Sequence, residues 1–256
     1  MLSYDTRQVD YKRIHQYDSN CMSSLAKSLE LRQDSILVDF MSGHADAANS
    51  VVNYYATKNI NVTPILVDKF SSQFPKNNSY VTLLSDVLSI PIPYNSVHAV
   101  TMKLGIHEIS SDKQIQVFNK AYNILKPACA FSICEIAERD DSFRDLFSLI
   151  VKKKDELAGF DDFVKNRFFC TQKELESYFL DSGFNPAKQV MMSNFNYNYS
   201  YLLQTDFKND KSKLLEFLDF IRNVVPKSYK KDLGFIDFHD SINLDFRMAV
   251  LSAVKS

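Results

Sequence analysis

Ile36-Leu-Val-Asp-Phe-Met-Ser-Gly-His-Ala-Asp46 is the stretch of sequence that decides the fold of this chain. Residues 36–39 are three apolar residues followed by an acid, a pattern that predicts a short buried strand. Small or turn-forming residues around Gly43 follow directly, and residues 47–55 then place apolar side chains on one face, which predicts a helix. A strand, a tight turn and a helix in this order point backbone N–H groups at a bound ligand. The stretch therefore predicts an α/β fold with a binding site at this turn.

The same stretch resembles motif I of the class I S-adenosylmethionine-dependent methyltransferases, in which an acid and a Gly-x-Gly-x-Gly turn close the first strand. Aligned on Asp39, the three glycine positions of the motif fall at Met41, Gly43 and Ala45, so this chain keeps only the central glycine. The resemblance implies that Asp39, Phe40 and Gly43 contact the cofactor.

Two further predicted strands also end in acids. Residues 61–68 end at Asp68, about 25 residues beyond Gly43, near the spacing at which Rossmann-like folds place a carboxylate on the ribose hydroxyls. A carboxylate can accept a hydrogen bond from each hydroxyl of the ribose. The alternative is an acid that only caps the helix after the strand.

The third strand begins at Tyr80 and leads to Asp86 and a loop with two prolines. This segment resembles one in the family whose acid meets the adenine amino group, and the alternative is an Asp that starts a turn. By the same resemblance, Lys69 and Val87, which directly follow the two acids, also contact the cofactor.

A fourth strand is predicted over residues 99–102, within a segment that resembles the fourth motif of the family. Its end, from Lys103 to Glu108, should open onto the site because ligands bind at the carboxyl ends of such strands. The resemblance implies that Lys103 lies on the cofactor side and that His107 and Glu108 are catalytic, where a base assists methyl transfer to a hydroxyl or an acidic carbon. The alternative is that His107 only makes structural hydrogen bonds.

The rest of the chain continues the resemblance. An amphipathic helix over residues 111–125 is followed by Pro127, by Ala128 and Cys129 where the family has two glycines, and by a fifth strand over residues 130–136.

After the fifth strand the family carries a variable lid, here residues 138–170, with a predicted helix over residues 142–154. Thr171-Gln-Lys-Glu174 has the capping-box pattern that begins a helix. Residues 187–203 and 243–254 are predicted as a closing strand pair, with a helix over residues 211–225 between them.

The N-terminal residues 1–35 are predicted to form a helical cap rich in tyrosine. The resemblance places Tyr11 over the cofactor pocket, and the alternative is that these tyrosines only pack on the surface.

Composition limits the classes of function. The 256 residues, 45% of them hydrophobic and 24% charged, predict a soluble globular protein. A formal net charge of -1 predicts no nucleic-acid partner, and no apolar run approaches the roughly 18 residues of a membrane span. Four cysteines without a Cys-x-x-Cys pair predict reduced thiols in a cytoplasmic protein, and no cluster has the spacing of metal ligands. The sequence leaves open whether the chain forms a homodimer.

The resemblance is closest to the small-molecule methyltransferases of the ubiquinone and menaquinone biosynthesis type. It implies one domain over residues 1–256: a Rossmann-like, seven-stranded, mostly parallel sheet with helices on both faces and an antiparallel last strand. It also implies S-adenosylmethionine as the cofactor. Closely spaced aromatic residues in the lid and near residues 195–201 favour a small, largely apolar or aromatic acceptor, unless they simply fill the core.

Two other functions compete with methyl transfer. Loss of glycines could crowd the cofactor, because glycine lets backbone approach a ligand closely. The chain would then use the methyltransferase fold for a cyclisation or rearrangement, or act as a binding subunit. A nicotinamide-dependent oxidoreductase is disfavoured, because the turn lacks Gly-x-Gly-x-x-Gly and leaves Asp86 without a role.

Overall fold

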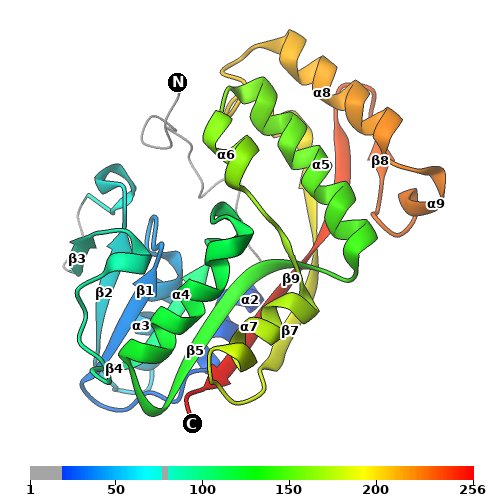
Figure 1. Ribbon diagram of the computed structural model, residues 1–256. Helices are drawn as coiled ribbons and strands as arrows, with labels where there is room; N and C mark the ends of the chain where they lie inside the picture. The colour runs from blue at the N-terminus through cyan, green and yellow to red at the C-terminus, as the bar shows by residue number, and fades with distance from the viewer. Residues whose placement is uncertain (1–18, 77–79) are drawn as a thin grey trace.

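The computed structural model describes residues 19–76 and 80–256, and its strands form one twisted sheet (Figure 1). Seven strands follow each other in the order β3-β2-β1-β4-β5-β9-β7. Their bounds are Val81–Leu84 for β3, Val62–Asp68 for β2, Ser35–Phe40 for β1, Val97–Lys103 for β4, Leu125–Glu138 for β5, Ile242–Val254 for β9 and Lys188–Asn198 for β7. β9 is antiparallel to both of its neighbours, and the other pairs on this path are parallel.

This arrangement confirms the predicted Rossmann-like sheet with an antiparallel last strand. The strand count differs slightly from the predicted seven, because two further strands of two residues each pair with strands of the sheet. β6 (Cys170–Thr171) pairs with β5, and β8 (Ile236–Asp237) pairs with β9. β5 is also longer than predicted: it begins directly after the preceding helix and passes through Pro127, with Ala128 in a left-handed conformation at φ 60°.

Helices cover both faces of the sheet because its central strands are apolar on both sides. In β1, Val38 and Phe40 belong to one apolar cluster, and Leu37 belongs to the other. The first cluster is covered by α4 (Ser111–Ile124) and α7 (Gln172–Asp181), and the second by α2 (Ser19–Lys27) and α3 (Asp46–Ala56). The predicted capping box is confirmed: Thr171 and Glu174 exchange both of its hydrogen bonds at the start of α7.

A second layer stands beyond the carboxyl ends of the parallel strands (Figure 1). It consists of α5 (Asp141–Ala158), α6 (Asp161–Asn166), the short helix η5 (Tyr199–Leu203), α8 (Lys211–Val224) and α9 (Lys227–Lys230). It has an apolar cluster of its own, in which Ile150 of α5 and Phe217 of α8 are buried together with Leu244 of β9. The predicted lid region therefore packs on the late helices as well as on the sheet.

The described residues contain no helix with the length and apolarity that crossing a bilayer requires. Of the predicted N-terminal cap they include only α2, and Tyr11 lies outside the described residues.

Candidate functional site

A cavity lies where the carboxyl ends of β1, β2 and β4 meet the second layer. Parallel α/β sheets bind ligands at this edge. The cavity is lined by most of the predicted cofactor residues and by both predicted catalytic residues: Asp39, Gly43, Asp68, Lys69, Asp86, Val87, Lys103, His107 and Glu108.

Phe40 lies elsewhere, contrary to the prediction. Its side chain is fully buried, packs against Phe131 and does not line the cavity. The physical reason is strand alternation: neighbouring residues of a strand point to opposite faces, so Asp39 and Phe40 cannot both face the site.

The turn after β1 has the backbone conformation of a three-glycine turn. Met41, Gly43 and Ala45 have φ angles of 50°, 48° and 64°, all in the left-handed region. That region costs a residue with a Cβ roughly 1–2 kcal/mol, so two of the three positions are strained. Two residues with a Cβ, Met41 and Ala45, thus hold backbone conformations that favour glycine.

The side chain of Met41 packs against Gly105, which lies just after β4, the strand beside β1. A Cβ added to Gly105 would lie 2.9 Å from Sδ of Met41, so Met41 packs where residue 105 has no side chain. A Cβ added to Gly43 would meet nothing within 4 Å, so the one glycine that remains in the turn borders open space.

Asp39 links this turn to the sheet. Its carboxylate is 1% exposed and accepts hydrogen bonds from Thr101 Oγ1 at 2.7 Å and from the backbone N–H of Ala48 at 3.2 Å. Burial raises the pKa of Asp39 from 3.8 to about 7, against the lowering effect of these hydrogen bonds and of Lys103. Lys103 in turn pairs with Asp46 at the start of α3.

This raised pKa predicts a specific dependence of stability on pH. Asp39 holds its proton more tightly in the folded than in the unfolded chain, so its ionisation opposes folding. Its contribution to the free energy of unfolding should fall between about pH 4 and about pH 7, by at most about 1.4 kcal/mol per pH unit. We expect Asp39→Asn to flatten this part of the curve in chemical unfolding measured from pH 5 to pH 8.

Burial also raises the pKa of Glu138 to about 7, so Glu138 makes the stability of the wild type fall with pH in the same range. The contribution of Asp39 is therefore read from the difference between wild type and variant. The exposed Asp112→Asn serves as the matched control. Parallel curves for wild type and Asp39→Asn would contradict the assignment to Asp39.

Asp68 connects β2 to the same turn. One carboxylate oxygen accepts from the backbone N–H of Gly43 at 3.0 Å, and the other from that of Phe70 at 3.0 Å. Burial raises its pKa. Asp68 is therefore more than the cap of a following helix: it fixes the Gly43 turn from the neighbouring strand while lining the cavity.

Asp86 is exposed and begins the short helix η3 (Val87–Ser89), where its carboxylate accepts from the backbone N–H of Leu88 at 2.9 Å. Asp86 therefore starts a turn, which is the alternative role that the sequence allowed for it. Asp86 also lines the cavity, so the adenine contact stays a prediction.

His107 lies in the short helix η4 (Ile106–Glu108), which follows β4 and lines the same cavity as Asp68 and Asp86. Its Nδ1 is 2.7 Å from Oε1 of Glu135, a carboxylate that is 1% exposed, and its ring stacks on Phe169 with centroids 4.9 Å apart. Nε2 has no hydrogen-bond partner within the described part of the chain and is not enclosed. The ring therefore offers one nitrogen to Glu135 and the other to the cavity.

Glu135 was not predicted as a site residue. It is one of two buried acids of β5, with Glu138, in a strand that is otherwise mostly apolar from Phe131 to Ala137, and an acid at a buried strand position is a usable signal. Its Oε2 also accepts from the backbone N–H of Ile106 at 3.1 Å, so Glu135 fixes both the imidazole and the turn that carries it.

Glu108 faces the cavity beside His107, and its ionic neighbour is Arg167, with an oxygen–nitrogen distance of 3.9 Å.

The second layer contributes a buried charge cluster that the sequence did not reveal. Asp155 is fully buried and contacts two cations, Lys154 at 2.7 Å and Arg167 at 2.7 Å. Lys154 also lies 3.2 Å from Asp206. Both cations and Asp206 line the cavity, with Asp155 behind them.

Two features of the turn fit S-adenosylmethionine. The Ser42 Oγ is buried, lines the cavity and has no hydrogen-bond partner among the described residues, so it is a polar group in need of a ligand. Gly43 borders open space at the start of α3, where backbone N–H groups favour a carboxylate. Within residues 19–76 and 80–256, no group of three or more His, Cys, Asp or Glu side chains could hold a metal ion.

Comparison with known proteins identifies similar folds among solved structures. No family model matches the sequence, and no curated protein matches it. Among solved structures, the YcgJ protein of Bacillus subtilis is 12% identical with a TM-score of 0.76, covering 93% of this chain and 99% of its own.

Two other solved structures are less similar. A SAM-dependent methyltransferase of Thermotoga maritima is 13% identical with a TM-score of 0.56, covering 96% of this chain and 93% of its own. The cyclase SpnF is 12% identical with a TM-score of 0.54, covering 93% of this chain and 81% of its own. The chain has the fold of the class I S-adenosylmethionine-dependent methyltransferases.

Proposed function

We propose that this protein transfers the methyl group of S-adenosylmethionine to a small, largely apolar or aromatic molecule in the cytoplasm. The observation that carries the proposal is that His107, held by the buried Glu135, faces the same cavity as the left-handed turn at Gly43 and the acid Asp68. The proposed site would thus combine a place for the cofactor with a base in the same cavity.

The residues of the turn would hold the cofactor. The backbone around Gly43 and the unpartnered Ser42 Oγ suit its carboxylate, and Asp68 and Asp86 suit its ribose and adenine. Lys69, Val87 and Lys103 line the same part of the cavity. When bound, S-adenosylmethionine supplies an electrophilic methyl group.

His107 would accept the proton that the acceptor loses. The hydrogen bond from Nδ1–H to Glu135 leaves the lone pair of Nε2 toward the cavity, and a carboxylate behind the ring stabilises the imidazolium that forms. Because methyl transfer otherwise depends on holding two reactants in one geometry, this base and the shape of the cavity are what the chain itself must provide.

The wall above His107 supports an apolar or aromatic acceptor. The ring contacts that begin with Phe169 on His107 continue through further aromatic residues that line the cavity: Phe147, Phe246, Tyr197 and Tyr199. Aromatic side chains provide apolar area with specific geometry, which suits a small ring or hydrocarbon. Residues 138–170 provide Phe147 and Phe169, which supports their role as the acceptor-side lid.

A non-methylating reaction on the same fold is the second candidate. The strained residues Met41 and Ala45 at the turn and the likeness to the cyclase SpnF favour it. Retention of Asp68 and of the His107–Glu135 pair favours methyl transfer.

Isothermal titration tests the cofactor. We expect heat from S-adenosylmethionine and S-adenosylhomocysteine and none from NAD. Asp68→Ala removes a carboxylate whose hydrogen bonds are each worth about 1.5–3 kcal/mol, so affinity should fall at least tenfold. The exposed Asp112→Ala is the control and should bind as the wild type does. Heat from NAD alone would overturn the proposal, and an unchanged dissociation constant in Asp68→Ala would limit Asp68 to bracing the turn.

Methyl-labelled cofactor then tests the reaction. The acceptors to compare are small aromatic and isoprenoid-like molecules, transfer RNA and peptides. We expect label in a small molecule. Label only in a macromolecule would contradict the proposed acceptor, and binding without any labelled product would favour the non-methylating candidate.

A further inference from the structure

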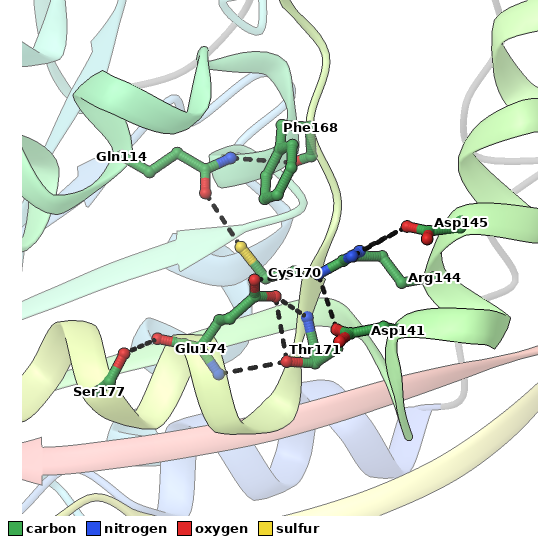
Figure 2. Close-up of polar contacts among 9 residues, drawn as sticks. All are labelled: Gln114, Asp141, Arg144, Asp145, Phe168, Cys170, Thr171, Glu174 and Ser177. Carbon is green, nitrogen blue, oxygen red and sulfur yellow. Dashed lines mark hydrogen bonds and ion pairs between the residues drawn. The ribbon is translucent and has the colours of Figure 1, made fainter.

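Gln114 in α4 is a fully buried amide that uses both of its ends. Its Nε2 donates to the carbonyl oxygens of Ile106 at 2.9 Å, Ile109 at 3.0 Å and Phe168 at 2.8 Å. Its Oε1 accepts from Sγ of Cys170 at 2.9 Å (Figure 2). The two N–H groups of one amide are therefore shared among three carbonyls from two separate segments.

These two segments form adjoining walls of the cavity. Ile106 and Ile109 bracket the turn that carries His107. Phe168 and Cys170 belong to residues 167–171, which run from α6 to α7 and are called the strap below. The strap contributes Phe169, whose ring stacks on His107, and its Phe168 N–H donates to the His107 carbonyl at 3.0 Å.

The turn of His107 is thus held from two sides. Glu135 holds it from the sheet through Nδ1 and the Ile106 N–H, and Gln114 holds it from α4 through the carbonyls of Ile106 and Ile109. If Gln114 were lost, Glu135 and the strap alone would have to fix the imidazole.

The orientation of the Gln114 amide is fixed by the carbonyls around Nε2 and by Cys170 at Oε1. Burial raises the pKa of the Cys170 thiol well above its ordinary value, so the thiol keeps the proton that it donates to Oε1. The strap is anchored just beyond Cys170, where the Thr171 N–H and Oγ1 contact Glu174 and where Arg144 of α5 pairs with Glu174 at 3.0 Å (Figure 2).

A buried polar residue at this place in α4 needs a reason. The other buried residues of the helix are apolar: Val117, Phe118, Ala121 and Ile124. A buried amide is destabilising unless its hydrogen bonds are satisfied. The hydrogen bonds of Gln114 go to the two walls of the cavity and not to α4 itself.

We infer that Gln114 is a positioning residue for the proposed methyl transfer, because its amide holds the turn of His107 and the strap of Phe169 in one fixed arrangement. The inference rests on the proposed function for its kinetic consequence, but the placement of the imidazole can be measured without it. The role of a purely structural hydrogen-bonding group is the competing explanation.

The test compares Gln114→Met, which keeps the length but loses all four contacts, with Gln114→Asn, which keeps the amide but is too short. Gln116→Met is the matched control, because Gln116 is exposed on the same helix. In the variants of Gln114 we expect kcat to fall at least tenfold and the KM for S-adenosylmethionine to stay within twofold. Gln116→Met should match the wild type in both.

Nuclear magnetic resonance of nitrogen-labelled histidine provides the second readout. The wild type and Gln116→Met should show a low-field Nδ1 proton of His107, the signature of its hydrogen bond to Glu135. The two Gln114 variants should broaden or lose this signal. If Gln114→Met does not fold, Gln114→Asn carries the test.

Two results would overturn the inference: an unchanged Nδ1 signal in a folded Gln114 variant, or kcat within twofold of wild type together with a lower unfolding midpoint. If the wild type itself transfers no methyl group, the proposed function fails, and the Nδ1 signal still decides whether Gln114 positions His107.

Discussion

His107→Gln is expected to lower kcat for methyl transfer at least a hundredfold. A positioned general base contributes typically about 10²–10⁴-fold, and glutamine can still donate to Glu135 while offering the cavity no basic nitrogen. Affinity for S-adenosylhomocysteine should stay within about twofold, because His107 is not among the predicted cofactor contacts. Steady-state rates with labelled cofactor and titration of the product measure the two effects.

His239→Gln is the control for this experiment, because His239 is exposed and does not line the cavity. A wild-type kcat in His107→Gln would show that the His107–Glu135 pair is structural. A loss of cofactor binding equal to the loss of rate would instead place His107 in the cofactor site.

Asp155→Asn is expected to destabilise the protein by about 3–5 kcal/mol, the usual effect of removing one partner of a buried ion pair. Asp155 is fully buried between Lys154 and Arg167, each 2.7 Å away. Without the charge of Asp155, Lys154 keeps Asp206 at 3.2 Å, and among the described residues the acid left to Arg167 is the more distant Glu108 at 3.9 Å. Chemical unfolding monitored by circular dichroism measures the change.

Asp145→Asn on the same helix is the matched control. Asp145 pairs with Arg144, but its side chain is 69% exposed, so the expected change is within about 1 kcal/mol. A change in Asp155→Asn as small as that of the control would mean that water from the cavity already compensates the two cations.

Most of the fold could be predicted because its central strands are parallel. Such strands are buried on both faces, so β1 and β4 appear in the sequence as short apolar runs at regular intervals. The capping box at Thr171 was predictable because it is encoded within four residues. The two-residue strands β6 and β8 were not: β6 pairs with the end of β5, more than 30 residues earlier, and β8, which pairs with the nearby start of β9, is too short to leave an apolar pattern.

Some residues of the candidate site could likewise be predicted from the sequence, and others could not. Asp39 and Asp68 were predictable because the carboxyl ends of parallel strands converge on one edge. The error at Phe40 was avoidable, because a residue next to Asp39 in a strand must face away from it. Glu135 could have been noticed as an acid in a buried strand, but its partner His107, 28 residues away, could not. Asp155 could not be assigned, because its contact with Arg167, 12 residues away, is encoded by no local pattern.

Because Met41 packs against Gly105, the effect of a substitution at either position depends on the residue at the other. Met41→Gly would relieve the left-handed strain at residue 41 and empty the space beside Gly105. Gly105→Ala in the present protein would place a methyl group 2.9 Å from Sδ of Met41. The effect of a side chain at residue 105 thus depends on which residue occupies position 41, so the two positions are epistatic. The same methyl group would also lie 3.2 Å from Cγ of Met102, so Met41→Gly relieves only part of the crowding at residue 105.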